Sequence, residues 1–328
     1  MTRKSFAAAF AMTMAAVTTS ALALDLDPAL PPYKAASGIS GQLASVGSDT
    51  LGSLSKLWAD GLRELYPSVK IEIESKGSAT APPALVDGTS QLGPMSRPMK
   101  NQEVEAFTSK FGYKPSRFRV AVDALAVYVN KDNPIQCLTL QQVDRIFSKT
   151  RWGSGGDNAK TWGDVGLAGD WATQSITLYG RNAASGTHDY FKESVLYNGD
   201  FKDEVKEQPG SAEVVKMVAG DRFAIGYSGI GYETDGVRAV PLAVSAGRHC
   251  YDTSPEAAYA NDYPVARYLY IYLNKNPNQP LDPILAETVK YILSKDGQTR
   301  TIQGGFYPIT KSDRLKDLEA LGIPTETN

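Results

Sequence analysis

Two patterns of apolar residues alternate along the chain and predict alternating strands and helices. Residues 69–74 alternate apolar and polar side chains, which is typical of a strand with one buried face. Across residues 51–66, apolar side chains recur at three- and four-residue spacing, as in an amphipathic helix. The other predicted elements are strands at 41–46, 175–179 and 223–228 and helices at 138–147, 188–196, 211–219, 282–294 and 313–321, with a long surface loop at 150–170. This succession predicts an α/β fold with mixed, mostly parallel sheets.

Two long apolar segments, 123–130 and 267–274, resemble each other, and each is followed by a lysine and a turn proline. We interpret them as two parallel-running strands that carry the chain out of one lobe and later back. The first lobe would then comprise residues 41–130 and 267–328, and residues 131–266 would form a second, inserted lobe. A chain of 328 residues exceeds the usual size of a single core, which also favours two lobes. Two unrelated buried strands are the alternative interpretation.

The first residues predict export. Residues 1–23 combine a short basic region, an apolar stretch and the small-residue pattern Ala21-Leu22-Ala23, which is typical of a secretory signal peptide. Residues 24–40 contain several prolines and no clear period, and we interpret them as a leader. No later segment reaches the roughly 18 uninterrupted apolar residues that a membrane span needs. We therefore expect a soluble, monomeric protein in the periplasm.

Charge and cysteine content restrict the partners. With 34 Lys and Arg against 36 Asp and Glu, the chain lacks the basic bias of nucleic-acid-binding proteins, so no nucleic-acid partner is expected. The two histidines, His188 and His249, form no ligand-spaced cluster, and we expect neither a metal nor another cofactor. An even count of cysteines in an exported chain favours one disulfide between Cys137 and Cys250, with two free buried thiols as the alternative.

Three turns that follow predicted strands and precede predicted helices carry residues typical of an anion site. The richest is Arg-Asn-Ala-Ala-Ser-Gly-Thr at 181–187, and the others lie at 47–50 and 77–80. A helix start presents free N–H groups and positive dipole charge, and the guanidinium of Arg181 matches two oxygens of a tetrahedral oxyanion. Plain helix capping is the alternative for each turn. Because ligands of α/β proteins bind beyond the carboxyl ends of strands, we expect the turns to converge in a cleft between the lobes.

The Arg-x-x-x-Ser-Gly-Thr motif, placed between a strand and a helix, resembles the signature of the periplasmic phosphate-binding proteins of ABC importers. Weaker matches to that family follow in its order at 47–51 with Trp58, 77–78, 92–99, 146–147 with Trp162, and 225–232. The resemblance covers nearly all of the mature chain. It implies a two-lobed, type 2 periplasmic binding protein whose interlobe cleft holds inorganic phosphate. It also implies an ABC permease in the inner membrane as partner, and no enzymatic activity.

The resemblance further implies which residues contact the ligand. These are Thr50, Leu51, Ser78, Arg181, Ser185, Gly186 and Thr187, with Ser48, Asp49, Ser96, Arg97 and Asp123 as further candidates. Many members of the family place an aspartate after the serine of the third segment, where it accepts the proton of hydrogen phosphate, but here Arg97 follows Ser96. Asp49 and Asp123 are the available substitutes, unless Asp49 is a capping residue and Asp123 a strand-end acid. Arg97 would add either a second cationic contact or a surface salt bridge.

Two rival functions remain from the residues alone. A carboxylate facing sulfate, which carries no proton at neutral pH, would be unpaired and repelled, so without that acid a binder of sulfate or another tetrahedral oxyanion is an alternative. An exported phosphatase is the other, and it requires metal ligands or a nucleophile. Ser185 and His188 are three residues apart with no orienting acid, and 226–231 lacks the G-x-S-x-G spacing. We therefore expect binding without covalent chemistry.

Overall fold

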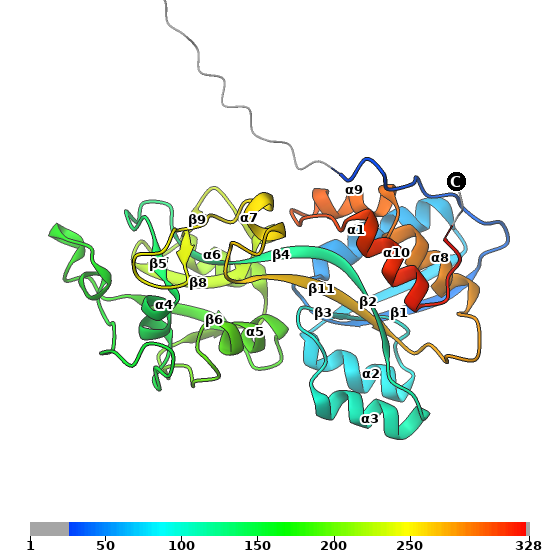
Figure 1. The fold of residues 1–328 in the computed structure, drawn as a ribbon, viewed down its shortest axis with the longest axis horizontal. Coiled ribbons are helices and arrows are strands. Elements are labelled where there is room, and N and C mark those ends of the chain that lie inside the picture. Colours follow the sequence, from blue (N-terminus) through cyan, green and yellow to red (C-terminus); the bar gives the residue numbers. More distant parts are fainter. Residues whose placement is uncertain (1–25, 326–328) are drawn as a thin grey trace, which may run out of the picture.

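The computed structural model describes residues 26–325, so the predicted signal peptide at 1–23 lies outside the described residues. Figure 1 shows two groups of elements joined by the long strands β4 (Ser116–Asn130) and β11 (Ala266–Leu273). We call these groups lobe 1 and lobe 2. Between residues 26 and 325, no helix is both long and apolar enough to cross a membrane.

Each lobe combines strands with covering helices. The elements of lobe 1 are β1 (Gly41–Gly47), α1 (Gly52–Leu65), β2 (Val69–Ser75), α2 (Ala81–Asp87), β3 (Gly93–Met95), α3 (Asn101–Phe111), α8 (Pro283–Ile292), α9 (Lys295–Gln303) and α10 (Lys311–Ala320). The elements of lobe 2 are β5 (Leu138–Thr139), α4 (Leu140–Phe147), β6 (Thr177–Arg181), α5 (Gly186–Ser194), β7 (Lys206–Gln208), α6 (Ser211–Ala219), β8 (Ala224–Gly229), β9 (Val237–Ala239), β10 (Leu242–Ala243) and α7 (Pro255–Tyr259). The predicted α/β class and two-lobed arrangement are confirmed.

The strands form one large mixed sheet and two small parallel ones. The large sheet has seven strands in the order β3-β11-β4-β8-β6-β7, with β9 also pairing with β4. Its β6 pairs in parallel with β7 and β8, as β1 does with β2 and β5 with β10. By contrast, β4 and β11 are antiparallel, so the interpretation of two parallel-running strands is wrong. A chain that leaves a lobe and returns beside its own path must reverse direction.

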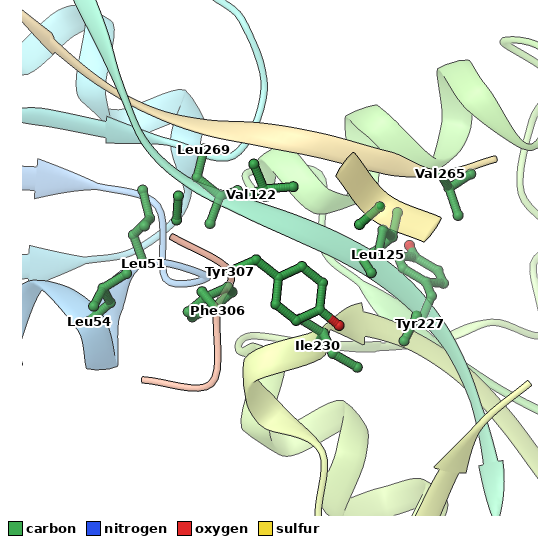
Figure 2. Close-up of a cluster of buried hydrophobic side chains, with 14 of the residues drawn as sticks. Leu51, Leu54, Val122, Leu125, Tyr227, Ile230, Val265, Leu269, Phe306 and Tyr307 are labelled. Carbon is green, nitrogen blue, oxygen red and sulfur yellow. The ribbon is translucent and has the colours of Figure 1, made fainter. Parts of the chain in front are cut away.

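The core is continuous through the two connecting strands. Nearly every side chain of β4 is buried, because both of its faces are covered. Figure 2 shows side chains of α1, β4 and β11 gathered around Phe306 and Tyr307, which lie in the loop after α9, with Tyr227 of β8 farther along β4. Helix α1 contributes Leu54 and Trp58 at the predicted helical spacing. Removing water from this apolar surface is the main favourable term for folding.

The predicted surface loop and the predicted leader both make contacts with the rest of the fold. The loop predicted at 150–170 contains Trp162, which is fully buried and donates from Nε1 to the carbonyl of Phe223 at 3.1 Å. Within the predicted leader, the carbonyl of Pro31 accepts from the N–H of Lys295, and the Tyr33 hydroxyl donates to Glu287 at 2.6 Å. An aromatic side chain in a loop thus supplies core, and the described part of the leader is docked on lobe 1.

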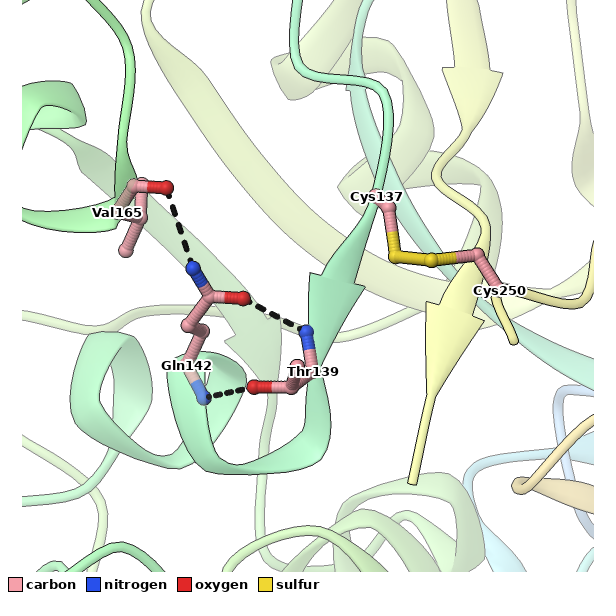
Figure 3. The surroundings of a disulfide bond; sticks show 5 residues. All are labelled: Cys137, Thr139, Gln142, Val165 and Cys250. Carbon is pink, nitrogen blue, oxygen red and sulfur yellow. Dashed lines mark hydrogen bonds between the residues drawn. A yellow bond between two sulfur atoms is a disulfide. The ribbon is translucent and has the colours of Figure 1, made fainter. Parts of the chain in front are cut away.

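The predicted disulfide joins Cys137 to Cys250, so the alternative of two free thiols is wrong. Figure 3 shows the bond beside the short strands β5 and β10, which pair in parallel. Nearby, Thr139 caps α4 as predicted: its side chain accepts from the N–H of Gln142, whose side chain accepts from the N–H of Thr139. The disulfide therefore fixes the edge of lobe 2 where α4 begins.

Candidate functional site

The three strand-to-helix turns converge between the lobes, as predicted. The hydroxyl oxygens of Thr50, at the start of α1, and Thr187, in α5, lie 2.8 Å apart. The N–H of Ala79 donates to the carbonyl of Ala184 at 3.1 Å, which joins the second and third turns. Gly186 packs so closely on lobe 1 that an added Cβ would lie 2.2 Å from the Ser78 hydroxyl oxygen. The described conformation is therefore one with the lobes closed.

Unpaired backbone donors line this junction. Among residues 26–325, no hydrogen bond reaches the backbone N–H groups of Thr50, Leu51, Ser78 and Gly186. All four residues are buried. A buried N–H without an acceptor costs about 1–3 kcal/mol, so such groups are rare in folded proteins. Four of them at three converging helix starts form a cradle for an acceptor-rich anion.

Arg181 supplies the positive charge of this cradle. It ends β6, and its side chain is fully buried. One terminal nitrogen donates to the Ser211 hydroxyl at 2.7 Å, and the other pairs with Asp49 and donates to the Pro209 carbonyl. Its Nε and the buried Ser48 hydroxyl have no hydrogen-bond partner in the described chain. Arg181 is therefore anchored at its tip and retains an unpaired donor along its stem.

Asp49 lies across the cleft from Arg181 and acts as its partner, not as a helix cap. Its other carboxylate oxygen accepts from the backbone N–H of Ser211 at 2.8 Å. The N-cap position of α1 is Leu51, and no side chain caps it, so the capping interpretation of Asp49 is wrong. Burial raises the pKa of Tyr232 to about 12, and its hydroxyl donates to the carbonyls of Asp49 and Thr50. These contacts hold the first turn in position.

Ser185 caps its helix and still keeps a hydroxyl proton for another partner. Its hydroxyl oxygen accepts from the N–H groups of Thr187 and His188, at 3.1 Å and 3.4 Å, and so caps α5. The capping alternative is correct for this side chain. The hydroxyl proton is not used by these two bonds and remains available for donation. The N–H of Thr187 already donates to the Ser185 hydroxyl, so the hydroxyl group of Thr187 is the group that it can present to a ligand in the cleft.

Arg267 is a buried cation of this cluster that the sequence analysis misses. It donates from Nε and Nη2 to Asp123 Oδ2, at 3.0 and 2.8 Å, from Nη2 to the Thr187 hydroxyl at 2.9 Å, and from Nη1 to the Ser96 carbonyl. The other Asp123 oxygen accepts from the N–H of Ile230. Asp123 thus accepts three hydrogen bonds, two at Oδ2 and one at Oδ1. One signal was available: Asp123 and Arg267 open the two similar segments, and β4 and β11 pair them in register.

Arg97 takes no part in the cradle, and it is not a surface residue either. Its side chain is only 5% exposed, and all its nitrogens are engaged by Glu103, Asp189 and the Pro98 carbonyl. The expectation of a surface salt bridge is therefore wrong, because the pair is buried. Its neighbour Ser96 lies in the cradle, where its hydroxyl oxygen is 3.2 Å from that of Ser78.

An open cavity of about 830 Å³ adjoins the Arg181 side of the cradle. Both lobes line it, with Asp49, Ser53 and Lys56 from lobe 1 and Ser211 and Glu213 from lobe 2. This cavity is the route by which solvent reaches Asp49. Across residues 26–325, no group of three or more His, Cys, Asp or Glu side chains is arranged to hold a metal ion.

Comparison with known proteins gives consistent matches. A family model described as a PBP superfamily domain matches residues 33–296. The phosphate-binding protein PstS of Pseudomonas aeruginosa is 50% identical over 323 residues, 98% of this chain and 100% of that protein. PstS of Staphylococcus saprophyticus is 26% identical over 279 residues, 83% of this chain and 82% of that protein. An ABC-type phosphate transport receptor from Vibrio cholerae has the same fold, with a TM-score of 0.64 at 19% identity, over 81% of this chain and 100% of that chain.

Proposed function

The chain belongs to the PBP superfamily and to the PstS family of phosphate-binding proteins, and from this we propose that it captures inorganic phosphate between its lobes and delivers it to an ABC importer. The observation that carries the proposal is the set of unpaired backbone N–H groups of Thr50, Leu51, Ser78 and Gly186 beside the buried cation Arg181. A tetrahedral oxyanion supplies acceptors in several directions at once. It also neutralises the partial charges of the helix starts.

The proposed contacts are of three kinds: backbone N–H groups, a guanidinium and hydroxyl groups. Thr50, Leu51, Ser78 and Gly186 would donate backbone N–H groups, and Arg181 would donate a charge-assisted hydrogen bond. Hydroxyl donors would come from Ser48, Ser78, Ser185 and Thr187. A ligand bound to both lobes favours the closed arrangement, because it contacts the two turns of lobe 1 and the turn of lobe 2 together only in that state.

Phosphate and sulfate differ for this site mainly in the ligand proton. Asp49 and Asp123 are the candidate acids, and each already pairs with a guanidinium, of Arg181 and Arg267 respectively. A paired carboxylate keeps lone pairs for a phosphate proton. Sulfate lacks that proton and would leave those lone pairs facing its own negative charge. We therefore propose that phosphate is preferred.

The same proposal covers the remaining organisation of the protein. Lobe 1 would comprise 41–130 with 267–328, lobe 2 would comprise 131–266, and a signal peptide at 1–23 would direct the chain to the periplasm. The mature protein would act as a monomer without enzymatic activity. Support for the last point comes from the family and from Ser185, whose hydroxyl caps α5 and is not hydrogen-bonded to His188's ring.

Calorimetric titration of the mature protein with phosphate and with sulfate tests this function. We expect saturable heat with phosphate and a much weaker response with sulfate. Equal binding of the two ions would show a general oxyanion binder, and no heat with phosphate would exclude the proposal. Turnover of a chromogenic phosphate ester that is lost in Ser185→Ala would instead establish a phosphatase.

Substituting Gly186 with alanine is expected to impair lobe closure and leave each lobe folded. The added Cβ would lie 2.2 Å from the Ser78 hydroxyl oxygen and 2.6 Å from that of Ser96. Overpacking of this kind costs about 1–3 kcal/mol, which corresponds to a phosphate affinity lower by about five- to 150-fold. Calorimetry measures the loss. Gly220→Ala is the matched control, because its Cβ meets nothing closer than 3.6 Å, and an equal loss there would contradict the argument.

A further inference from the structure

A buried group of charges outside the phosphate cradle crosses the cleft. Arg97, which follows β3 in lobe 1, donates from Nε to Asp189 Oδ2 in lobe 2 at 2.8 Å. Lys100, just before α3, places Nζ 2.7 Å from the same oxygen. Glu103 in α3 binds the two terminal nitrogens of Arg97, both at 2.8 Å. Two cations and two carboxylates thus meet, and only Asp189 belongs to lobe 2.

Opening the lobes would leave this group unbalanced. Lobe 1 would retain Arg97, Lys100 and Glu103, with one positive charge in excess, and Asp189 would leave with the compensating negative charge. The side chains of Arg97 and Asp189 are 5% and 16% exposed, so solvent screens their attraction less than that of a surface pair. Lys100 is 56% exposed and contributes less. Closure therefore restores a neutral cluster that is partly shielded from solvent.

Arg97 is oriented for Asp189 by contacts within lobe 1. Glu103 holds both terminal nitrogens, and the Pro98 carbonyl accepts from one of them. These contacts direct the remaining donor, Nε, across the cleft. The guanidinium gives up little further freedom when Asp189 arrives, which reduces the entropic cost of forming the interlobe pair.

Asp189 is attached directly to the cradle. It lies in the first turn of α5, two residues after Thr187 and three after Gly186, which packs on Ser78 and Ser96. Burial alone would raise the pKa of Asp189, but hydrogen bonds from His188 and Lys100 and the charges of Lys100 and Arg97 lower it to about 2. The carboxylate therefore stays charged at pH values below 3.8, its ordinary pKa, and loses its charge only as the pH falls toward 2.

We propose that Asp189 is a positioning residue for ligand capture: held by Arg97 and Lys100 across the cleft, it forms a charge latch that favours the closed lobes and brings the start of α5 onto lobe 1. The latch deepens the proposed function, on which its affinity readout rests. It touches no ligand and acts through the position of Gly186 and Thr187.

Two isosteric substitutions separate the latch from ordinary stabilisation of Arg97. Asp189→Asn removes the carboxylate that crosses the cleft, and Glu103→Gln removes the one that stays within lobe 1. We expect Asp189→Asn to raise the phosphate Kd at least about tenfold, mainly through faster dissociation. Glu103→Gln should change it less than about threefold, because the amide oxygen of the glutamine can still accept from Arg97 and keep it oriented. Added salt should weaken wild-type binding more steeply than that of Asp189→Asn.

The lobe separation can be measured without any ligand. Cysteines introduced at the exposed positions Glu105 in α3 and Glu193 in α5 can carry spin labels, because both native cysteines are disulfide-bonded. In the ligand-free protein, Asp189→Asn should shift the distance distribution measured by pulsed electron paramagnetic resonance toward longer values, and Glu103→Gln should shift it much less. Unchanged distances in Asp189→Asn, or equal effects of the two substitutions, would overturn the latch. Absence of phosphate binding by the wild type would instead refute the proposed function, with the distances still deciding the latch.

Discussion

Replacing Arg181 with methionine is expected to lower phosphate affinity by about three orders of magnitude. The substitution removes the buried cation of the cradle and leaves Asp49 unpaired beside the bound anion. Breaking a buried ion pair by removing one partner costs about 3–5 kcal/mol, and about 4 kcal/mol corresponds to a thousandfold change in Kd. Calorimetric titration, or a competition assay if binding becomes too weak for direct heat, measures the loss.

The double variant Arg181→Met/Asp49→Asn distinguishes the two sources of this loss. It removes the unpaired carboxylate, so it should recover part of the affinity of the single variant and remain well below the wild type. The pair joins β6 to the turn before α1, across the cleft, and each lobe keeps its own core, so circular dichroism should show an intact fold. Near wild-type binding by Arg181→Met would exclude Arg181 as the main countercharge.

The helix starts of the cradle are predictable from sequence because their signals are local. A Gly-Ser-Thr turn between a strand pattern and a helix pattern fixes where free N–H groups must lie, whatever the rest of the chain does. The order of strands and helices then places the 47–50 and 77–80 turns in lobe 1 and the 181–187 turn in lobe 2, where they meet across the cleft. The amphipathic pattern of α1 is local in the same sense, and the structure confirms it.

The charge partners of the cleft are not predictable in this way, because they join residues far apart in the chain. Asp123 and Arg267 are 144 residues apart, and Arg97 and Asp189 are 92 apart. Which carboxylate meets which guanidinium depends on the register of β4 against β11 and on how the lobes close. A position such as Arg97 therefore looks like a lost acid in the sequence, whereas in the fold it is one half of an interlobe pair. The burial of Trp162 escapes prediction for the same reason, since Phe223, whose carbonyl accepts from the Trp162 indole, is distant in sequence.

Removing the disulfide, by Cys137→Ser together with Cys250→Ser, is expected to lower the free energy of unfolding by about 4–5 kcal/mol. The bond closes a segment of 113 residues, and a loop of this length loses much conformational entropy in the unfolded chain. The midpoint of thermal unfolding should fall by about 10 °C. Thermal and urea unfolding, followed by circular dichroism, measure both changes.

Measuring phosphate binding shows whether the disulfide affects only the stability of the protein or its affinity as well. The disulfide lies beside β5 and β10, which form a small sheet of their own, whereas Arg181 ends β6 in the large sheet. The double serine variant should therefore bind phosphate with a Kd within about twofold of the wild type at temperatures where it is folded. Reductant should destabilise the wild type to the level of the variant and leave the variant itself unchanged. Equal stability of the two proteins under oxidising conditions would show that the fold of lobe 2 does not depend on the disulfide. A large loss of affinity in the double serine variant would show that the edge of lobe 2 around β5 and β10 supports the cradle.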